Sequence, residues 1–572
     1  MKRPPMGRLV ALLAALVLAM TIVSVRLGVL QVSRGGEYQD LALDQRVRSL
    51  VLPATRGQIL DREGEAPLAL SLEARDIYAD PRYVEDPYAV AQELAPALGL
   101  KPRPVMKALG ADTSFVYIAR QVDLDQANRV AKLRLPGIGF LEVSKRYYPA
   151  GSLASQVLGF VGTEGAGLSG LEYGYQDLLA GRPGERTLEI DPNGQPIAGG
   201  LRVDRPPIPG EDIVTTIDRD LQYQVEVALA QAVKANRAKG GSVIVMDRAT
   251  GDILVMATYP SFDPNDFAAS PEETWRNRAV TDAFEPGSVN KVITAAAAVE
   301  ERALPLDERL LVPDRLPVGE FTIHDSHPHP PQRMMLGDIV AESSNVGAIL
   351  VARRLGEERM AEYLSRFGFG QETGLRFPGE SAGIVLPLYQ WSDTSLATMA
   401  YGQGIAVSQL QMAAVYATIA NGGVWVQPRL VRGTVDAEGV YHEAPPSATR
   451  RVVSEQTARI VTQMLAYAVD SGTGSAARIA GYQVAGKTGT ARIPFPDRPG
   501  YYENKYVASF IGFLPASAPS VVIAVMIDQP ATVYGGVAAA PLFQQIARYA
   551  IQRFGIAPGR PLPPPPHALA LP

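Results

Sequence analysis

The chain has 572 residues, 47% of them hydrophobic and 20% charged, a composition typical of ordered globular domains and a length sufficient for several of them. Its formal net charge of −5 gives no indication of a nucleic-acid partner. Cysteine is absent, which excludes disulfides, a cysteine nucleophile and thiolate metal sites, and five histidines leave few bases for a Ser-His-Asp triad.

The N-terminus contains a candidate membrane anchor. An uncharged apolar run extends from Leu9 to Val25, and apolar residues after Arg26 can lengthen it to a membrane span over 9–32. The basic residues before the run are Lys2, Arg3 and Arg8. They predict a cytoplasmic tail over 1–8 and place the rest of the chain on the far side of the membrane. A cleaved signal peptide is the alternative, but no small-x-small cleavage site follows the run before RGGE, so an uncleaved anchor is favoured.

Residues 35–210 predict a loosely built α+β module. Short strands divided by Gly, Pro and Asp-Arg turns come first, and helical periodicity follows at Tyr88–Leu98 and Asp123–Leu133. The Pro/Gly-rich stretch DRPPIPGED, Asp204–Asp212, marks its end.

Residues 211–556 predict one α/β domain with an antiparallel sheet. DIVTTID is a strand, RDLQYQVEVALAQAVKANRA is a long amphipathic helix, and GGSVIVMDRATGDILVMATYP is a hairpin. The same hairpin pattern returns in YVASFIGFLPASAPSVVIAVMID, and PLFQQIARYAIQRF closes the domain as a helix. Residues 557–572 form a proline-rich tail without a core-forming pattern.

Three short motifs in this domain carry candidate chemistry. Ser288 and Lys291 are spaced i, i+3 at a helix start, where the partial positive charge of the helix disfavours a protonated amine, so that a desolvated lysine can take the serine proton. A second segment, VAESSNVGAIL, contains Ser343 and Asn345, and a third, QVAGKTGTARI, contains Lys487–Thr490. Taken singly, each motif is equally compatible with a helix cap or with a turn that carries a solvated lysine.

Together, in the order Ser-x-x-Lys, Ser-x-Asn, Lys-Thr-Gly, the motifs resemble the acyl-transfer set of penicillin-binding proteins and β-lactamases. The chain resembles class B penicillin-binding proteins over nearly its whole length, and their division-specific members most closely. TRGQILDREGEAPLA, RYYPAG and GLSGLEYGYQDLLAG resemble the three motifs of the family's non-catalytic pedestal. NRAVTDAFEPGSVNK, ESSNVG, YGQGIAVSQLQMAAVYATIANGG and GKTGTA resemble its transpeptidase domain. Asn290 departs from the family, which usually has a small or apolar residue before the lysine.

The resemblance implies a multidomain α+β fold: a single transmembrane helix, an elongated pedestal and a C-terminal domain of the serine β-lactamase-like type. It implies a serine-type D-Ala-D-Ala transpeptidase that cross-links peptidoglycan stem peptides at the septum, with an amine of a neighbouring stem as acceptor and β-lactams as covalent inhibitors. No metal or organic cofactor is implied. Expected partners are an FtsW-type glycan polymerase and other division proteins, with the enzyme at the division site of a bacterial inner membrane. An elongation-specific class B transpeptidase is the alternative.

The same resemblance implies the residue roles. Ser288 is the nucleophile, Lys291 its base, and Asn345 holds Lys291 and the substrate amide. Ser343 relays a proton to the leaving D-alanine under the electrostatic influence of Lys487. The set that would bind the substrate carboxylate is Thr488, Gly489 and Thr490. The N–H groups of Ser288 and Thr490 would form the oxyanion hole.

Three other interpretations are weaker. GAGLSG, Gly165–Gly170, fits a dinucleotide-binding fingerprint, but the helix that would follow is too short for a βαβ crossover. The set His324, His327 and His329 suggests a metal site, but the prolines between them favour an exposed loop with solvated histidines. A β-lactamase would have about half this length and neither anchor nor pedestal.

Overall fold

The computed structural model describes residues 6–33, 46–189, 197–200, 202–532, 534–563 and 565. Most of the predicted cytoplasmic tail, the predicted start of the pedestal at 35 and half of the predicted proline-rich tail lie outside these residues. The chain forms two compact units. One consists of Met1–Thr55 and Gly181–Pro209, and the other of Arg56–Ala180 and Gly210–Pro572.

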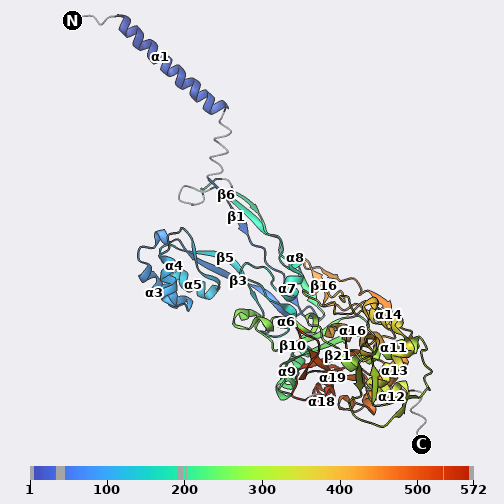
Figure 1. The fold of residues 1–572 in the computed structure, drawn as a ribbon. Helices are drawn as coiled ribbons and strands as arrows, with labels where there is room; N and C mark the ends of the chain where they lie inside the picture. The colour runs from blue at the N-terminus through green and yellow to red at the C-terminus, as the bar shows by residue number, and fades with distance from the viewer. Residues whose placement is uncertain are drawn as a thin grey trace. The chain divides into compact units, whose positions relative to one another are not determined.

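The first unit contains the predicted anchor and a small sheet. Helix α1 (Met6–Gly28) continues into a π-helical turn, Val29–Ser33 (Figure 1). Within the described residues, Met6–Val32 is long and apolar enough to cross a membrane, with a mean hydropathy of 2.4, and fits a single-pass anchor. The sheet pairs β1 (Val47–Leu52), β6 (Gly184–Glu189) and β7 (Arg202–Arg205) in antiparallel fashion.

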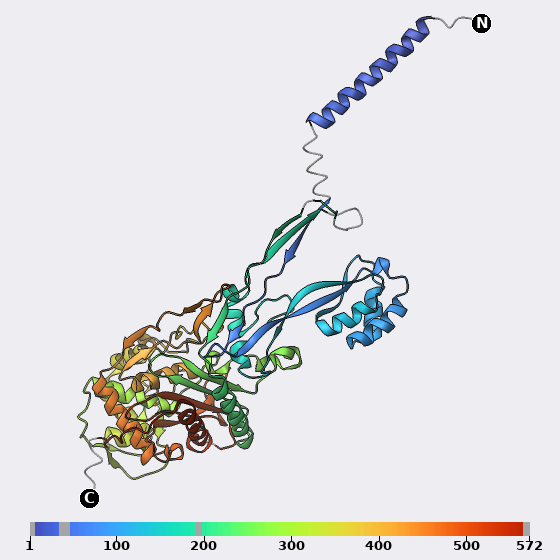
Figure 2. The ribbon, with the colours of Figure 1, turned by 180° about the vertical axis from the view of Figure 1, so that it is seen from behind.

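The second unit begins with a small α/β lobe, whose helices are drawn in blue in Figure 2. Its strands are β3 (Pro67–Ala79), β4 (Val116–Asp123) and β5 (Ile138–Tyr147), and its helices are α3 (Pro87–Leu98), α4 (Pro102–Leu109) and α5 (Leu124–Lys132). The predicted helices at Tyr88–Leu98 and Asp123–Leu133 are confirmed by α3 and α5. Buried apolar side chains from these helices and from β3 and β4 form a core of their own.

A larger sheet joins the segments on the two sides of residue 210. Its order is β17–β16–β8–β2–β3–β4, with β5 paired to β3. The added strands are β2 (Ile59–Leu60), β8 (Asp212–Thr215), β16 (Val431–Val435) and β17 (Tyr441–Glu443). Strands β2 and β8 pair in parallel, the others in antiparallel fashion. The segments before and after 210 therefore share backbone hydrogen bonds, whereas the composition of the sequence predicts a boundary there.

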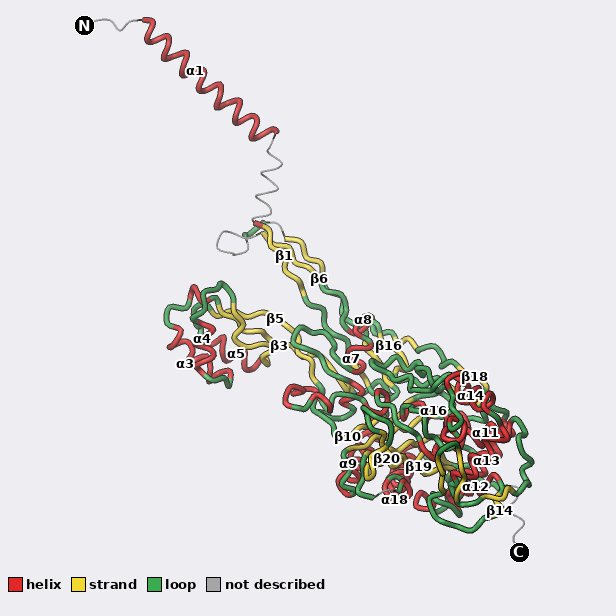
Figure 3. Tube along the Cα trace, in the orientation of Figure 1, coloured by secondary structure: helices red, strands yellow, loops and turns green. Residues whose placement is uncertain are grey.

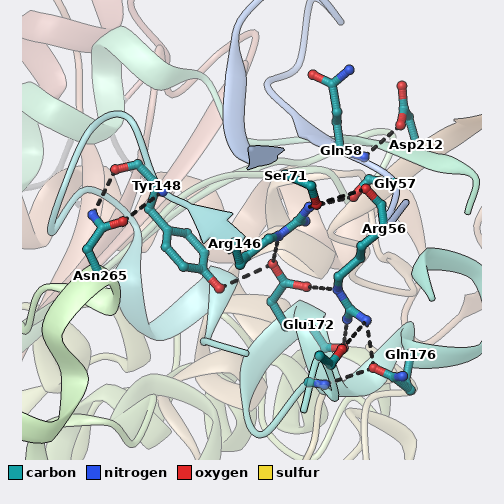
Figure 4. A network of polar contacts seen from close by, with 12 residues as sticks. Arg56, Gly57, Gln58, Ser71, Arg146, Tyr148, Glu172, Gln176, Asp212 and Asn265 are labelled. Carbon is teal, nitrogen blue, oxygen red and sulfur yellow. Dashed lines mark hydrogen bonds and ion pairs between the residues drawn. The ribbon is translucent and has the colours of Figure 1, made fainter. Parts of the chain in front are cut away.

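Three buried charged residues, one from each predicted pedestal motif, meet beside this sheet (Figure 4). Glu172 lies on the short helix α7 (Gly170–Gly174), which is followed by α8 (Gln176–Leu179). Its carboxylate accepts hydrogen bonds from Arg56 Nε and Arg146 Nε, both at 2.6 Å, while all three side chains are at most 6% exposed. Tyr148 OH also donates to this carboxylate, and the backbone of Tyr148 exchanges two hydrogen bonds with the side chain of Asn265. The three motifs therefore connect the lobe to residues beyond 210.

The predicted antiparallel sheet of the C-terminal domain has the order β10–β9–β21–β20–β19. Its strands are β9 (Gly240–Asp247), β10 (Ile253–Tyr259), β19 (Ala485–Pro494), β20 (Tyr501–Leu514) and β21 (Val521–Asp528). Helices α9 (Arg219–Ala235) and α19 (Ala540–Phe554) bury their apolar side chains against one face. The short helix α18 (Gly535–Ala538) comes directly before α19 in the chain. Both predicted hairpins and both predicted helices are confirmed.

The opposite face of this sheet is covered by a helical region that forms the largest core (Figure 3). Its helices are α10 (Arg278–Thr281), α11 (Lys291–Glu300), α12 (Leu336–Ala341), α13 (Asn345–Leu355), α14 (Glu357–Arg366), α15 (Ser395–Met399), α16 (Gln409–Ala420) and α17 (Glu455–Asp470). Three two-stranded ribbons complete it: β11 (Leu310–Val312) with β14 (Gln332–Met334), β12 (Arg315–Val318) with β13 (Phe321–His324), and β15 (Val424–Val426) with β18 (Thr449–Arg451). Helix α11 is buried along most of its length, which places its first residue between the helices and the sheet.

Candidate active site

Ser288 lies in a 3₁₀ turn, Gly287–Asn290, and α11 begins only at Lys291. The sequence predicts that one helix carries both residues, whereas the structure inserts this tighter turn. Side chains at i and i+3 eclipse in a 3₁₀ turn, which aligns the two groups directly. Lys291 Nζ lies 3.1 Å from Ser288 Oγ.

The second motif is the turn between α12 and α13. Ser344 is the N-cap of α13, and its Oγ accepts a hydrogen bond from Gly347 N at 2.8 Å. The helix-cap interpretation is therefore correct for Ser344 and leaves its two neighbours for other contacts. Ser343 has a left-handed backbone with φ of +62°, and Asn345 is the first residue of the helix.

The third motif lies inside strand β19, at the edge of the sheet, and not in a turn before a hairpin. Lys487 is 1% exposed, so it is not a solvated lysine. Its Nζ lies 3.3 Å from Thr488 Oγ1, which in turn lies 2.9 Å from Thr473 Oγ1. Gly489 packs against the nucleophile turn: a Cβ there would lie 3.0 Å from Val289 Cγ1 and 3.3 Å from Pro286 O. The glycine thus lets the chain's own backbone approach, a different reason from the ligand backbone that the sequence suggests.

The contacts of Lys291 are compatible with a neutral amine. Nζ lies 2.5 Å from Ser343 O and 2.8 Å from Asn345 Oδ1, two atoms that only accept hydrogen bonds. It also lies 3.1 Å from Ser288 Oγ and 3.3 Å from Ser343 Oγ. A neutral amine has two N–H donors and one lone pair. In the neutral state the two acceptors can use both donors, and the lone pair can then face the hydroxyls.

Burial supports this state. It lowers the pKa of Lys291 well below its usual value; the positive charge of Lys487 lowers it further, and the carboxylate of Asp325 opposes both. Burial also lowers the pKa of Lys487 to about 7, against the opposing charge of Glu342. The sequence attributes the neutral lysine to the helix N-terminus, whereas desolvation is the main cause in the structure.

A cavity of about 560 Å³ opens over these groups. Its lining includes Ser288, Ser343, Asn345, Thr488 and Thr490, which joins all three motifs in one site. Thr490 Oγ1 accepts a hydrogen bond from Gly535 N at 3.1 Å. Several lining residues carry no recognisable motif in the sequence, including Thr473 and Tyr534. Tyr401 also lines the cavity, and it begins YGQGIAVSQLQMAAVYATIANGG, a stretch that resembles the family's transpeptidase domain.

The structure gives the two alternative segments other roles. Gly165–Gly170 leads into α7, a helix of five residues that carries Glu172, so the segment has no crossover helix for a dinucleotide. Among the described residues, no three or more His, Cys, Asp or Glu side chains are placed to hold a metal ion. His324 and His327 are exposed, as predicted for a solvated loop, but the His329 side chain is only 15% exposed and pairs with Asp325.

Comparisons with known proteins agree with the geometry. The penicillin binding protein transpeptidase domain matches residues 241–548, and the penicillin-binding protein dimerisation domain matches residues 51–215. The penicillin-binding protein PbpB of Mycobacterium tuberculosis is 37% identical, with 96% of this chain and 86% of that protein covered. The peptidoglycan D,D-transpeptidase FtsI of Escherichia coli is 34% identical, with 91% and 87% covered. A crystal structure of penicillin binding protein 3 from M. tuberculosis, complexed with aztreonam, has a TM-score of 0.71 at 34% identity and covers 90% of this chain and 99% of that one.

These matches and the three assembled motifs define a serine acyltransferase of the penicillin-binding fold. The chain belongs to the class B penicillin-binding proteins, and it is a peptidoglycan D,D-transpeptidase. The family resemblance inferred from the sequence motifs is confirmed. The β-lactamase alternative fails because the chain also carries the dimerisation domain.

Proposed function

We propose that Ser288 is the nucleophile of the transpeptidase and Lys291 the base that activates it. The observation that carries this proposal is the 3.1 Å distance from Lys291 Nζ to Ser288 Oγ in a buried site, where Ser343 O and Asn345 Oδ1 also lie within hydrogen-bond distance of Nζ. Covalent catalysis by a serine requires such an adjacent base.

In the first half-reaction, Ser288 Oγ attacks the carbonyl carbon between the two D-alanines, and its proton passes to Lys291. The C–N bond then breaks, and the leaving D-alanine takes a proton through Ser343, whose hydroxyl is 3.3 Å from Lys291 Nζ. In the second half-reaction, the amine of a neighbouring stem attacks the ester carbonyl and loses a proton to the same relay, and Ser288 regains its own. The N–H groups of Ser288 and Thr490 stabilise the oxyanion in both steps.

The residues of β19 bind the donor. The hydroxyls of Thr488 and Thr490 line the cavity and are suited to hold the terminal carboxylate, with Gly489 between them. Lys487, buried next to Thr488, adds positive potential when protonated and lies close enough to Lys291 to lower its pKa.

Fluorescent penicillin tests the nucleophile, because β-lactams acylate the serine that the donor acylates. The full chain with Ser288→Ala should fold normally and take no label. Ser365→Ala, an exposed serine on α14, is the matched control and should label like the unmodified protein. Undiminished labelling of Ser288→Ala would place the nucleophile elsewhere.

We further propose that the enzyme works at the division septum with an FtsW-type glycan polymerase, contacted through the anchor and pedestal. Support comes from the second motif, which ends in Asn345 where elongation-type relatives usually carry aspartate, and from the similarity to FtsI of E. coli. Depleting the protein in its host should give filaments with unfinished septa. Rounded, widened cells that still divide would move it to the elongation machinery and leave the catalytic residues unchanged.

The proposed topology has residues 1–8 in the cytoplasm and the catalytic domain on the outer, periplasmic side of the inner membrane. Lys2, Arg3 and Arg8 before the apolar run support this orientation. A chain that starts near Gly35 should be soluble and still take penicillin, because the anchor contributes attachment and not catalysis. Failure to label despite a cooperative melt would show that the catalytic unit begins earlier.

A further inference from the structure

The loop after β13, which contains His327 and His329, holds the second catalytic motif through the carboxylate of Asp325. The side chain of Asp325 is 6% exposed. Its Oδ1 accepts hydrogen bonds from the backbone N–H groups of Asn345 at 2.5 Å and Val346 at 3.0 Å. Its Oδ2 accepts from Ser344 Oγ at 2.6 Å and lies 3.1 Å from His329 Nε2. The carboxylate therefore contacts three consecutive residues at the N-terminus of α13, where a negative charge is stabilising.

The residue before Asp325 fixes the side chain of Asn345. His324 O accepts a hydrogen bond from Asn345 Nδ2 at 3.1 Å, which leaves Oδ1 to face Lys291 at 2.8 Å. The loop is itself tied down, because Asp325 N donates to Asp314 O at 3.0 Å. Residues 324 and 325 thus determine both the backbone and the amide orientation of the motif asparagine.

Ser343 needs such support. Its φ of +62° is a left-handed conformation that is strained for a residue other than glycine, and strained residues persist only where neighbouring contacts hold them. This conformation brings both the carbonyl and the hydroxyl of Ser343 to Lys291 Nζ. Asp325 on one side and the bond from Ser344 N to Ile339 O on the other hold the residue that follows.

His329 is the cation of this arrangement. Its Nδ1 lies 2.8 Å from Pro330 O and its Nε2 lies 3.1 Å from Asp325 Oδ2, two atoms that accept hydrogen bonds, so both ring nitrogens act as donors. The Pro330 carbonyl and then Asp325 raise the pKa of His329. The other charged group that acts on His329 is Asp314. The charge of Lys487 on β19 lowers the pKa of Lys291, and the charge of Asp325 in the loop raises it.

We propose that Asp325 is a positioning residue of the transpeptidase: it holds residues 344–346 so that Ser343 and Asn345 face Lys291, and His329 supports it as a counter-ion. The proposal rests on the roles proposed above for Ser288 and Lys291. It gives His329 a function without a metal, because its ring contributes a charge next to Asp325.

The test is the rate of acylation by fluorescent penicillin from pH 5 to 9, measured on the full chain in detergent. Acylation requires neutral Lys291, so the rate rises with pH through the pKa of this lysine. Asp325→Asn should lower the plateau about 10–100-fold, because the motif loosens. It should also move the rising part of the pH–rate curve (the acid limb) to lower pH, because the negative charge of Asp325, which raises the pKa of Lys291, is gone. Asp314→Asn, in the turn between β11 and β12 and without a hydrogen bond to the described residues 344–346, should change the plateau less than twofold.

His329→Gln is the second variant and has the opposite sign. Glutamine keeps a donor for Asp325 but removes the positive charge, so the acid limb should move to higher pH while the plateau falls less than threefold. A limb that stays in place in both variants would overturn the proposal, even if activity falls, because simple destabilisation lowers amplitude without moving the limb. A plateau of Asp325→Asn within twofold of the unmodified protein would also overturn it. Labelling of Ser288→Ala in the same series would instead overturn the proposed nucleophile.

Discussion

Two regions of this protein each bury two basic side chains beside one acidic group, with opposite results. In the catalytic cluster, Lys291 and Lys487 are 2% and 1% exposed, and Asp325 is the nearby carboxylate. In the cluster formed by the three pedestal motifs, Arg56 and Arg146 pair with Glu172 (Figure 4). The first cluster adjoins residues that line a cavity, such as Ser288 and Thr488, and the second is enclosed by the chain.

The difference comes from the chemistry of the two cations. A buried lysine can release its proton, and burial lowers the pKa of Lys291 well below its usual value. An arginine stays charged, so burying it requires matched oxygens. Arg56 finds them on the carboxylate and the backbone of Glu172 and on Gln176. The lysine pair therefore suits proton transfer, whereas the arginine pair suits a fixed connection.

The sharpest way to break this comparison is to exchange the cation at the active site. Lys291→Arg should reduce penicillin acylation about 10³–10⁴-fold, because a guanidinium keeps its proton at every accessible pH. The exposed Lys239→Arg is the matched control and should not change the rate. Timed labelling with fluorescent penicillin measures both. Labelling of Lys291→Arg at the rate of the unmodified protein would exclude the lysine as the base.

The reciprocal change removes the charge of the structural cluster. Glu172→Gln keeps the shape but leaves Arg56 and Arg146 buried without a counter-charge, so the free energy of unfolding should fall by about 3–5 kcal/mol. Thermal unfolding of the full chain measures the loss, with the exposed Glu93→Gln on α3 as control. The remaining folded protein should still acylate at low temperature. An unchanged melting temperature would show that this cluster does not hold the lobe.

The second lysine sharpens the comparison by a smaller amount. Lys487→Met should slow acylation about 10–100-fold and raise the pKa of Lys291, because a positive neighbour is removed. The acid limb of the pH–rate curve should therefore move to higher pH. A curve that keeps its position would show that Lys487 acts only by contact with Thr488.

The smallest effect concerns a carboxyl group for which the described residues supply no cationic partner. Glu226 on α9 accepts hydrogen bonds from Ala154 N and Gln222 Nε2, and burial raises its pKa to about 7. The folded protein therefore holds a proton that the unfolded chain releases at lower pH, so stability is lost as pH rises between the two values. Because the residue is half-buried, Glu226→Gln should gain only about 1 kcal/mol at pH 8 and nothing at pH 4. Melting curves at both values check this, and a gain at pH 4 would contradict it.

Much of the fold could be predicted because its signals are local. The apolar run of α1, the periodicity of α3, α5 and α9, and the two hairpins all follow from patterns within short windows. Ser288, Lys291, Ser343, Asn345 and Lys487 could be found because the chemistry fixes residue types at short spacings. The strand state of Lys487–Thr490 could not be separated from a turn, because Gly and Thr occur in both and tertiary pairing with β20 decides.

The remaining features depend on contacts between distant segments. Asp325 looks like an ordinary loop acid between histidines, and only the fold places it against Asn345. In the sequence, Arg56 and Arg146 resemble solvated loop residues, and only the fold shows that both pair with Glu172. The sequence also predicts a boundary at 210, since composition records the proline-rich linker but not the sheet that crosses it.

That shared sheet has a consequence for biosynthesis. Strand β2 pairs with β8 through Ile59 and Ile213, and β8 pairs with β16 through Thr215 and Val431. At a synthesis rate of about 5–20 residues per second, β8 is made about 10–30 s after β2, and β16 about 10–40 s after β8. During these intervals the nascent chain presents unpaired strand edges, which favour aggregation. A chain interrupted before β16 therefore lacks a complete sheet and leaves the edge of β8 unpaired.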